Sequence, residues 1–415
     1  MGHYRLRNTP AQSLPGAIRA TDRAVQVTSG PMARRGRRAA EPLARLMLDS
    51  IDDSRRGAVP VSAYPGVSAE ALDAAVFMHR VAPAVYLHLR EDPDTPVDLL
   101  EPMRDRYQQQ ILRLLQVQAD ITHVSQVFSG AGLAWLTMKG AALAEHLWSR
   151  PDLRQYNDLD ILVDRRSFGV ALDALVDSGA EMVDRNWPLI EAQMRGEVSL
   201  RLPNGTALDL HWNLVNNPVL RKAFRFRTPE LLERSVEIKI GSVTVPTLDP
   251  ADTLLHLAYH TAHSGGHRLM WLKDVERATA SPDLDWDEAL QRARRDGIAL
   301  ALGVVLARVG AVIGFEKAPP AAALRPARRT AWGVFAAGVD TWSPVPGLPH
   351  DKFSGQIAFK NTRGSSSASI AAAVASLKGR RGGGGGPSEN PLYVEAGGAA
   401  ARAAYLRIVE GGREP

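Results

Sequence analysis

Two aspartates in one short segment are spaced so that they could hold metal ions. Asp158 and Asp160 alternate with Leu159, Ile161 and Val163. Alternate residues of a β-strand share a face, so the apolar side chains would enter a core while the two carboxylates point together to the opposite side. Adjacent carboxylates repel each other unless a cation lies between them. Hard oxygen ligands of this kind suit Mg²⁺, with Mn²⁺ as a second candidate.

A third carboxylate follows in the same alternating pattern. Residues 197–202 and 207–214 are predicted to form two strands joined at Asn204-Gly205, a strong hairpin signal. The apolar face of the second strand would consist of Leu208, Leu210, Trp212 and Leu214. Asp209 and His211 would lie on the other face. If this strand lies beside the first, three aspartates converge into a site able to hold two divalent ions for in-line phosphoryl transfer.

A strand-to-helix turn precedes these carboxylates. Lys139-Gly140 lies between an apolar strand over 133–138 and a helix predicted from Ala141. The N-terminus of a helix presents free N–H groups to phosphate oxygens, the glycine permits close approach, and the lysine adds a charge. An ordinary turn is the alternative interpretation, which the downstream carboxylates disfavour. Arg154, four residues before Asp158, could pair with a triphosphate or neutralise Asp158, and both interpretations stay open.

These elements, in this order, resemble a known group of proteins. The chain is similar to the polymerase-β-type nucleotidyltransferase superfamily, and within it to a largely uncharacterised bacterial branch with a KG…R…DxD…(D/E)xHW pattern. The matching residues are Lys139-Gly140, Arg154, Asp158-Leu159-Asp160 and Asp209-Leu210-His211-Trp212. The resemblance covers about residues 107–280. Most of the superfamily has Gly-Ser where this chain and the similar branch have Lys-Gly.

The resemblance implies a fold, a reaction and a set of site residues. It implies an α+β fold with a small mixed sheet and flanking helices, and transfer of a nucleoside monophosphate from a nucleoside triphosphate such as ATP to a hydroxyl acceptor, with release of pyrophosphate. The implied catalytic metal ligands are Asp158, Asp160 and Asp209. The implied nucleotide-binding residues are Lys139, Gly140 and Arg154. His211 could donate a hydrogen bond to a ligand carboxylate, contact the substrate or be structural, and we expect the first or the last of these rather than direct catalysis.

A histidine stripe provides an alternative. His256, His260 and His263 recur at helical spacing on a helix predicted from Ala251, which Ser264-Gly265-Gly266 should end. This pattern would suit a metal-dependent phosphohydrolase. The similar branch carries a comparable stretch in a helical part that closes one side of its cleft, here with Trp271 and Asp274. A third hypothesis is a catalytically silent module that binds nucleotide without turnover, although the intact aspartates argue against it.

Composition and charge exclude several classes of protein. The chain has 415 residues, 45% of them apolar, and no cysteine, which excludes disulfides, thiol catalysis and cysteine-ligated zinc. No apolar stretch is long enough to cross a bilayer or to form a signal peptide, so we expect a cytoplasmic protein. The net charge is +5 overall, +7 in 1–40 and +6 in 318–415, which leaves −8 for 41–317. Such an acidic body favours a small-molecule, peptide or protein acceptor over nucleic acid.

Periodicity and composition predict five parts. They are a flexible basic arm (1–40), an N-terminal helical part (41–105), the nucleotidyltransferase core (106–246), a C-terminal helical subdomain (247–316) and a low-complexity, largely disordered tail (317–415). A long helix over 97–128 should pack across the sheet. In the tail, a short helix is predicted around 370–377, before a glycine run at Gly382–Gly386.

Overall fold

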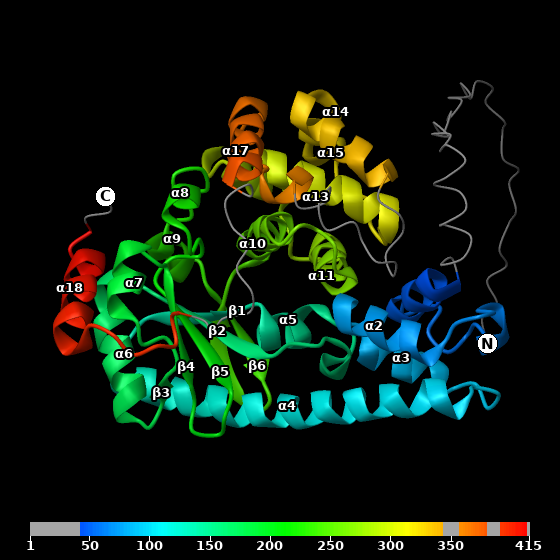
Figure 1. Ribbon diagram of the computed structural model, residues 1–415, viewed down its shortest axis with the longest axis horizontal. Coiled ribbons are helices and arrows are strands. Elements are labelled where there is room, and N and C mark those ends of the chain that lie inside the picture. The colour runs from blue at the N-terminus through cyan, green and yellow to red at the C-terminus, as the bar shows by residue number, and fades with distance from the viewer. Residues whose placement is uncertain (1–41, 343–356, 380–390, 413–415) are drawn as a thin grey trace, which may run out of the picture.

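The computed structural model describes residues 42–342, 357–379 and 391–412 (Figure 1). The predicted basic arm and the glycine run at Gly382–Gly386 lie outside the described residues. None of the helices in the described ranges combines the length and the apolar character needed to cross a bilayer.

A seven-stranded mixed sheet forms the centre of the molecule, in the order β3-β4-β5-β2-β1-β7-β6. The strands are β1 (Trp135–Met138), β2 (Asp158–Val163), β3 (Glu181–Met182), β4 (Glu197–Arg201), β5 (Ala207–His211), β6 (Val236–Ile240) and β7 (Val243–Thr247). The β2–β5 and β1–β7 pairs are parallel, and the other neighbours are antiparallel. The predicted α+β class with a small mixed sheet is confirmed.

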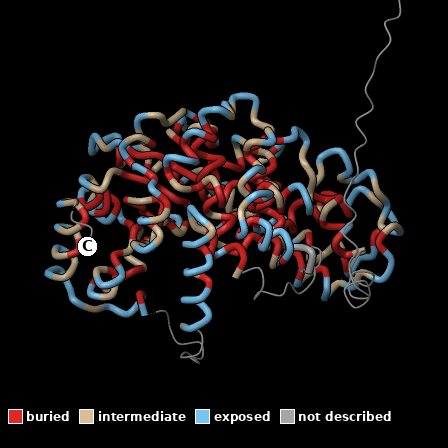
Figure 2. Tube along the Cα trace, turned by 90° about the horizontal axis from the view of Figure 1, so that it is seen from above, coloured by how far each residue is buried: buried red, intermediate tan, exposed pale blue. Residues whose placement is uncertain are grey.

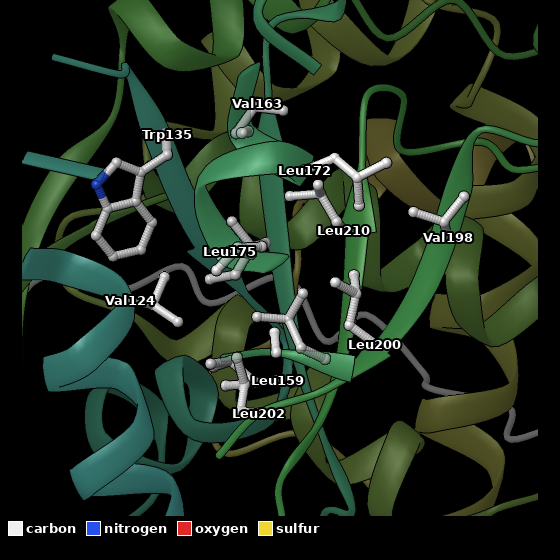
Figure 3. Packing of buried hydrophobic residues seen from close by; sticks show 14 of the residues in the cluster. Val124, Trp135, Leu159, Val163, Leu172, Leu175, Val198, Leu200, Leu202 and Leu210 are labelled. Atoms are coloured by element: carbon white, nitrogen blue, oxygen red, sulfur yellow. The ribbon is translucent and has the colours of Figure 1, made fainter. Parts of the chain in front are cut away.

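One face of the sheet packs on the long helix α4 (Val97–Gly130), as predicted (Figure 1). Leu159 and Val163 of β2 meet Val124 of α4 in this core, together with apolar residues of β4 and β5 (Figure 3). Alternation along the strands directs these side chains to one face, and the helical spacing of the α4 residues presents a matching stripe. The same core holds α6 (Phe168–Asp177) and α7 (Trp187–Ala192). Asp120 of α4 also accepts a hydrogen bond from Asn204, which anchors the predicted β4–β5 hairpin.

The opposite face of the sheet is covered by the helices that follow it (Figure 1). They are α10 (Pro250–His263), α11 (Leu269–Ala280), α12 (Trp286–Arg295) and α13 (Ala299–Val312). The Asp249 side chain accepts a hydrogen bond from the amide of Asp252 at the start of α10, and Pro250 occupies the first turn, a strong helix-start signal. Ser264 ends α10 as predicted. Leu214 packs on this side rather than with Leu208 and Leu210, because β5 already ends at His211.

The N-terminal helices form a separate core beside the sheet. They comprise a helix over 42–51, α2 (Ala69–His79), α3 (Ala82–Leu89) and the first turns of α4, with short 3₁₀ turns at Val61–Ala63 and Pro151–Leu153. A further 3₁₀ turn at Arg165–Ser167 follows β2 and leads into α6. Leu269, Met270 and Trp271 of α11 enter this core. Because α4 runs on from this core to the sheet, the predicted boundary at residue 105 lies inside one continuous helix.

Residues after 317 differ from the expected disorder wherever the structure describes them, because they form helices (Figure 1). Along the described chain, buried residues gather in the interior and exposed residues lie toward the outside (Figure 2). They form α14 (Ala321–Arg329), α15 (Ala331–Trp342), a short helix over 357–360, α17 (Ser366–Gly379) and α18 (Gly398–Glu410). The predicted helix at 370–377 lies within α17. Tyr405 of α18 enters the core of the sheet and donates a hydrogen bond of 2.6 Å to the carbonyl of Arg195. Alanine forms helices well and packs closely, so its abundance does not prevent order.

The remaining helices connect the strands of the core. They are α5 (Gly140–Leu147), which follows β1, and α8 (Pro218–Arg221) and α9 (Thr228–Glu233), which lie between β5 and β6.

Candidate functional site

The parallel pairing of β2 and β5 brings two of the predicted carboxylates together. Asp160 of β2 lies directly opposite Asp209 of β5. Asp158 precedes Asp160 by two residues, on the same face of β2, and lies opposite Ala207. Ser199 of β4 donates a hydrogen bond of 2.6 Å to Asp209. Within the described part of the chain, the residues able to offer ligand atoms within 4.8 Å of one another are Asp160, Asp209 and His211. Carboxylate oxygens from two neighbouring strands are ligands that suit a hard divalent cation.

Lys139 extends directly to these carboxylates. Its ammonium Nζ lies 2.6 Å from Asp160 Oδ1, in a buried site. The backbone of Lys139 has φ 52°, and Gly140 follows with φ 25°. A Cβ at Gly140 would lie 2.9 Å from the carbonyl oxygen of Asp158. The turn therefore requires glycine at its second position, and it places the lysine where a cation would neutralise the acidic pair.

Arg154 has a different partner from either of those considered from the sequence. Its guanidinium forms two hydrogen bonds of 2.9 Å with Asp274 of α11, and a third of 2.9 Å with the carbonyl of Gly140. Both charged side chains are buried. Trp148 also donates to Asp274, at 2.8 Å. Arg154 thus ties the Lys139-Gly140 turn to the helical subdomain, and Asp274 is part of this link.

The acidic pair is electrostatically asymmetric. Burial would raise the pKa of Asp160, but Lys139 and His211 together hold it well below its usual range. Burial and the negative charge of Asp160 raise the pKa of Asp158. Burial and the negative charges of Asp160 and Glu197 raise the pKa of Asp209 to about 6. One carboxylate is therefore firmly ionised, while Asp209 is poised to take up a proton near neutral pH.

His211 contacts one of the site carboxylates. Its Nε2 lies 3.1 Å from Asp160 Oδ1 and forms a hydrogen bond with it. Burial would lower the pKa of His211, but the Asp160 hydrogen bond and the Glu197 charge raise it. Glu197 Oε2 lies 3.2 Å from His211 Nδ1, in a direction that does not make a hydrogen bond. A protonated His211 would stabilise the Asp160 carboxylate and orient it.

Glu197 and Ser199 are site residues that sequence reasoning missed. In the β4–β5 ladder, Glu197 lies opposite His211 and Ser199 lies opposite Asp209. Val198 and Leu200 alternate with them and enter the core. The hairpin turn at Asn204-Gly205 sets this register, so counting back from the turn could have identified both residues.

A pocket of about 150 Å³ opens beside the carboxylates. The predicted nucleotidyltransferase residues that line it are Lys139, Gly140, Arg154, Asp158 and Asp160. His260 of the histidine stripe also lines it. Arg80, from the end of α2, and Arg268, from the start of α11, line its other side and were not predicted. The pocket is therefore formed jointly by the sheet, the N-terminal helices and the helical subdomain.

The histidine stripe is used for packing. The His260 ring lies edge-on to Trp271, with centroids 5.3 Å apart, and His263 lies 4.9 Å from Tyr259 in the same manner. Burial lowers the pKa of His260 to about 3 and that of His263 to about 4, which keeps both rings neutral. Among the described residues, the stripe is not part of a group able to hold a metal. The histidine-centred phosphohydrolase therefore has no support from the geometry.

The fold and the site define a class of protein. A mixed sheet with carboxylates on two neighbouring parallel strands, beside a Lys-Gly turn, is a nucleotidyltransferase-type arrangement. The chain belongs to the family described as "Uncharacterised nucleotidyltransferase", whose model matches residues 65–314.

One solved structure and a search of curated proteins complete the comparison. The chain is similar to an antigenic nucleotidyltransferase-like protein from Paracoccidioides brasiliensis, with 15% identity and a TM-score of 0.29. The similarity covers 43% of this chain and 88% of that chain. No curated protein matches the chain.

Proposed function

We propose that the protein transfers a nucleoside monophosphate from a nucleoside triphosphate, with ATP as one candidate, to a hydroxyl-bearing acceptor. The main support is the placement of Asp160 and Asp209 side by side on parallel strands, at the Lys139-Gly140 turn. Membership of a nucleotidyltransferase family supports the same class of reaction.

The residues present fit a divalent cation. Asp160 and Asp209 offer oxygen ligands, and the raised pKa values of Asp158 and Asp209 reflect carboxylates crowded together in a buried site. In the proposed site, Asp158, Asp160 and Asp209 would hold Mg²⁺, with Mn²⁺ as a substitute. When bound, the ion would neutralise phosphate charge and favour ionisation of the attacking hydroxyl.

The protein's own residues have separate roles in the proposed reaction. Lys139 and the backbone at Gly140 would bind the phosphates, and Arg154 would hold the turn in place through Asp274. The acceptor oxygen attacks the α-phosphorus, the bond from that phosphorus to the bridging oxygen breaks, and pyrophosphate leaves with the bonding electrons. Asp209 would help to hold the ion and so lower the pKa of the acceptor hydroxyl, or would accept the proton of that hydroxyl. His211 would keep Asp160 oriented.

The acceptor is proposed from charge. Residues 41–317 carry a net charge of −8, which disfavours a surface that follows a nucleic-acid backbone. A small molecule, a peptide or a protein is therefore the proposed acceptor. The proposed compartment is the cytoplasm.

A thermal-shift experiment tests the donor site. The midpoint of unfolding would be measured with each ribonucleoside triphosphate, with and without Mg²⁺, for the wild type and for the Asp158→Ala/Asp160→Ala variant. We expect a Mg²⁺-dependent rise for at least one nucleotide that the variant loses, because a ligand of the native state stabilises it. An equal rise in both proteins would overturn the assignment of the carboxylates.

A second assay separates an enzyme from a silent module. Transfer of label from the α-phosphate of the bound nucleotide, with release of pyrophosphate, would be followed with small-molecule and protein acceptors. The Asp160→Asn variant should show neither product. Tight nucleotide binding without pyrophosphate release from any acceptor mixture would instead favour a silent binding module.

A further inference from the structure

We propose that Arg80 and Arg268 form an anion-binding pair that holds the distal phosphates of the donor triphosphate. This inference rests on the proposed function and extends it to two residues outside the strand-turn-helix unit. Both arginines line the pocket that also contains Lys139, Gly140 and Asp158. They come from elements far apart in the sequence, since Arg80 ends α2 and Arg268 precedes α11.

A buried hydrogen bond joins the residues next to the two arginines. The amide of Leu269 donates to His79 Nδ1 over 3.2 Å. These residues are the immediate neighbours of Arg268 and Arg80. The bond is buried, so it fixes the end of α2 against the start of α11. Arg80 and Arg268 then both line the same pocket.

Of the cations that line the pocket, Arg80 and Arg268 are the two without a carboxylate partner among the described residues. Lys139 is paired with Asp160, and Arg154 is paired with Asp274. Across the residues that the structure describes, no carboxylate lies within ion-pair distance of Arg80 or Arg268. The Arg268 Nε is buried and has no hydrogen-bond partner among them. Two partly buried guanidinium groups without carboxylate partners suit an anion between them.

The electrostatics of the pair agree with this reading. Burial lowers the pKa of Arg268, and the nearby charge of Arg80 lowers it further. Burial also lowers the pKa of Arg80, against the attraction of Asp158. An anion between the two groups would relieve both their mutual repulsion and their loss of hydration.

The backbone at Arg80 supports a role for its side chain. Arg80 closes α2 in the left-handed conformation, with φ 58° and ψ 43°. Glycine is the usual residue at such a helix end because it adopts this conformation without strain. The Arg268 side chain is in turn held by the Trp271 ring, whose centroid lies 4.5 Å from the guanidinium carbon. Arginine at a position suited to glycine is explained if its guanidinium binds a ligand.

Phosphate chains from two sources share this chemistry. A nucleoside triphosphate and inorganic tripolyphosphate both present adjacent phosphates, and each phosphate can accept two hydrogen bonds from one guanidinium group. Lys139 and Gly140 would contact the phosphates nearer the nucleoside, and the arginine pair would contact those farther away. A monophosphate should therefore gain little from Arg80 or Arg268.

The test is calorimetric titration of the full-length protein in Mg²⁺ buffer with ATP, inorganic tripolyphosphate and AMP. The variants are Arg80→Gly, Arg268→Gln and the control Arg104→Gln, which removes a half-exposed surface pair with Glu101. We expect each pocket variant to weaken binding of ATP and tripolyphosphate about tenfold or more, and that of AMP less than about twofold. Arg80→Gly should melt at or above the wild-type temperature without ligand, because it relieves the left-handed backbone.

The outcomes separate this inference from the proposed function. Unchanged affinity for ATP and tripolyphosphate in both pocket variants overturns the inference, as does a wild type that binds neither. An equal loss in Arg104→Gln also overturns it, because the effect would then be one of general charge. If the arginines control affinity while the Asp158→Ala/Asp160→Ala variant binds ATP as the wild type does, the inference stands and the proposed function fails. Tripolyphosphate binding without ATP binding identifies inorganic polyphosphate as the ligand of the pair.

Discussion

Replacing Asp209 with asparagine should stabilise the metal-free protein at neutral pH. Burial and the Asp160 and Glu197 carboxylates raise the pKa of Asp209 from 3.8 to about 6. An acid whose pKa is higher in the folded state destabilises the fold above that folded pKa. This loss of stability disappears as the pH falls below the unfolded value. The rise of about two pH units corresponds to about 3 kcal/mol at pH 7.5.

The measured gain should be smaller than this upper value. Asparagine keeps the shape of the side chain and can still accept the Ser199 hydrogen bond, but that bond loses its charged acceptor, at a cost of about 1 kcal/mol. We therefore expect Asp209→Asn to raise the free energy of unfolding by about 1–3 kcal/mol at pH 7.5. The electrostatic contribution should fall to about 1 kcal/mol at pH 4.5, because that pH lies between the unfolded pKa of 3.8 and the folded pKa of about 6.

Urea unfolding in the presence of a chelator measures this effect at both pH values. Tryptophan fluorescence and circular dichroism should be followed together, because coincident transitions justify a two-state free energy. Asp160→Asn is the matched control with the opposite sign, since it leaves the partly buried Lys139 ammonium without its 2.6 Å partner. An Asp209→Asn protein that is less stable than the wild type at pH 7.5, or equally altered at both pH values, would refute the electrostatic reasoning.

Four further perturbations test other parts of the structure. Gly140→Ala should lower the free energy of unfolding by at least about 1–2 kcal/mol, because its Cβ would meet a strand carbonyl at 2.9 Å, and an unchanged urea midpoint would contradict this. Asp274→Asn should cost about 3–5 kcal/mol by leaving the buried Arg154 charge unpaired, and a loss below 1 kcal/mol would show that the pair is not needed. His260→Phe should leave Mg²⁺-dependent nucleotide binding intact, whereas stoichiometric zinc in the wild type, by elemental analysis, that the variant loses would restore the histidine-site hypothesis. Tyr405→Ala should cost about 3–5 kcal/mol by opening the core of the sheet, and a wild-type melting temperature would argue against docking of α18.

Local pattern determined the strands, the turn and the polar face of the site. Alternation in 158–163 and 207–211 predicted which residues enter the core, and it placed Asp158, Asp160 and Asp209 on the polar side. Alternation and hairpin chemistry depend on residues close in sequence, so they can be read without a structure. The same hairpin also carries Glu197 and Ser199 into the site. Their positions follow from the strand register across the turn, but neither residue was predicted from the sequence.

Only the tertiary structure decided what surrounds these residues. The adjacency of Asp160 and Asp209 depends on the parallel pairing of β2 and β5, which brings together two residues 49 positions apart in the sequence. The Arg154–Asp274 pair joins residues 120 positions apart. Composition suggested disorder for 317–415, yet α18 docks on the sheet because Tyr405 finds an apolar core formed by other segments.

The sequence by itself therefore determined the chemistry that the polar face offers, through residue type and strand parity. The tertiary structure decided which cations face it, by bringing Arg80 and Arg268 together across the contact between His79 and Leu269. The physical reason is that alternation and turn preference are properties of neighbouring residues, whereas packing and charge pairing arise between segments distant in the chain.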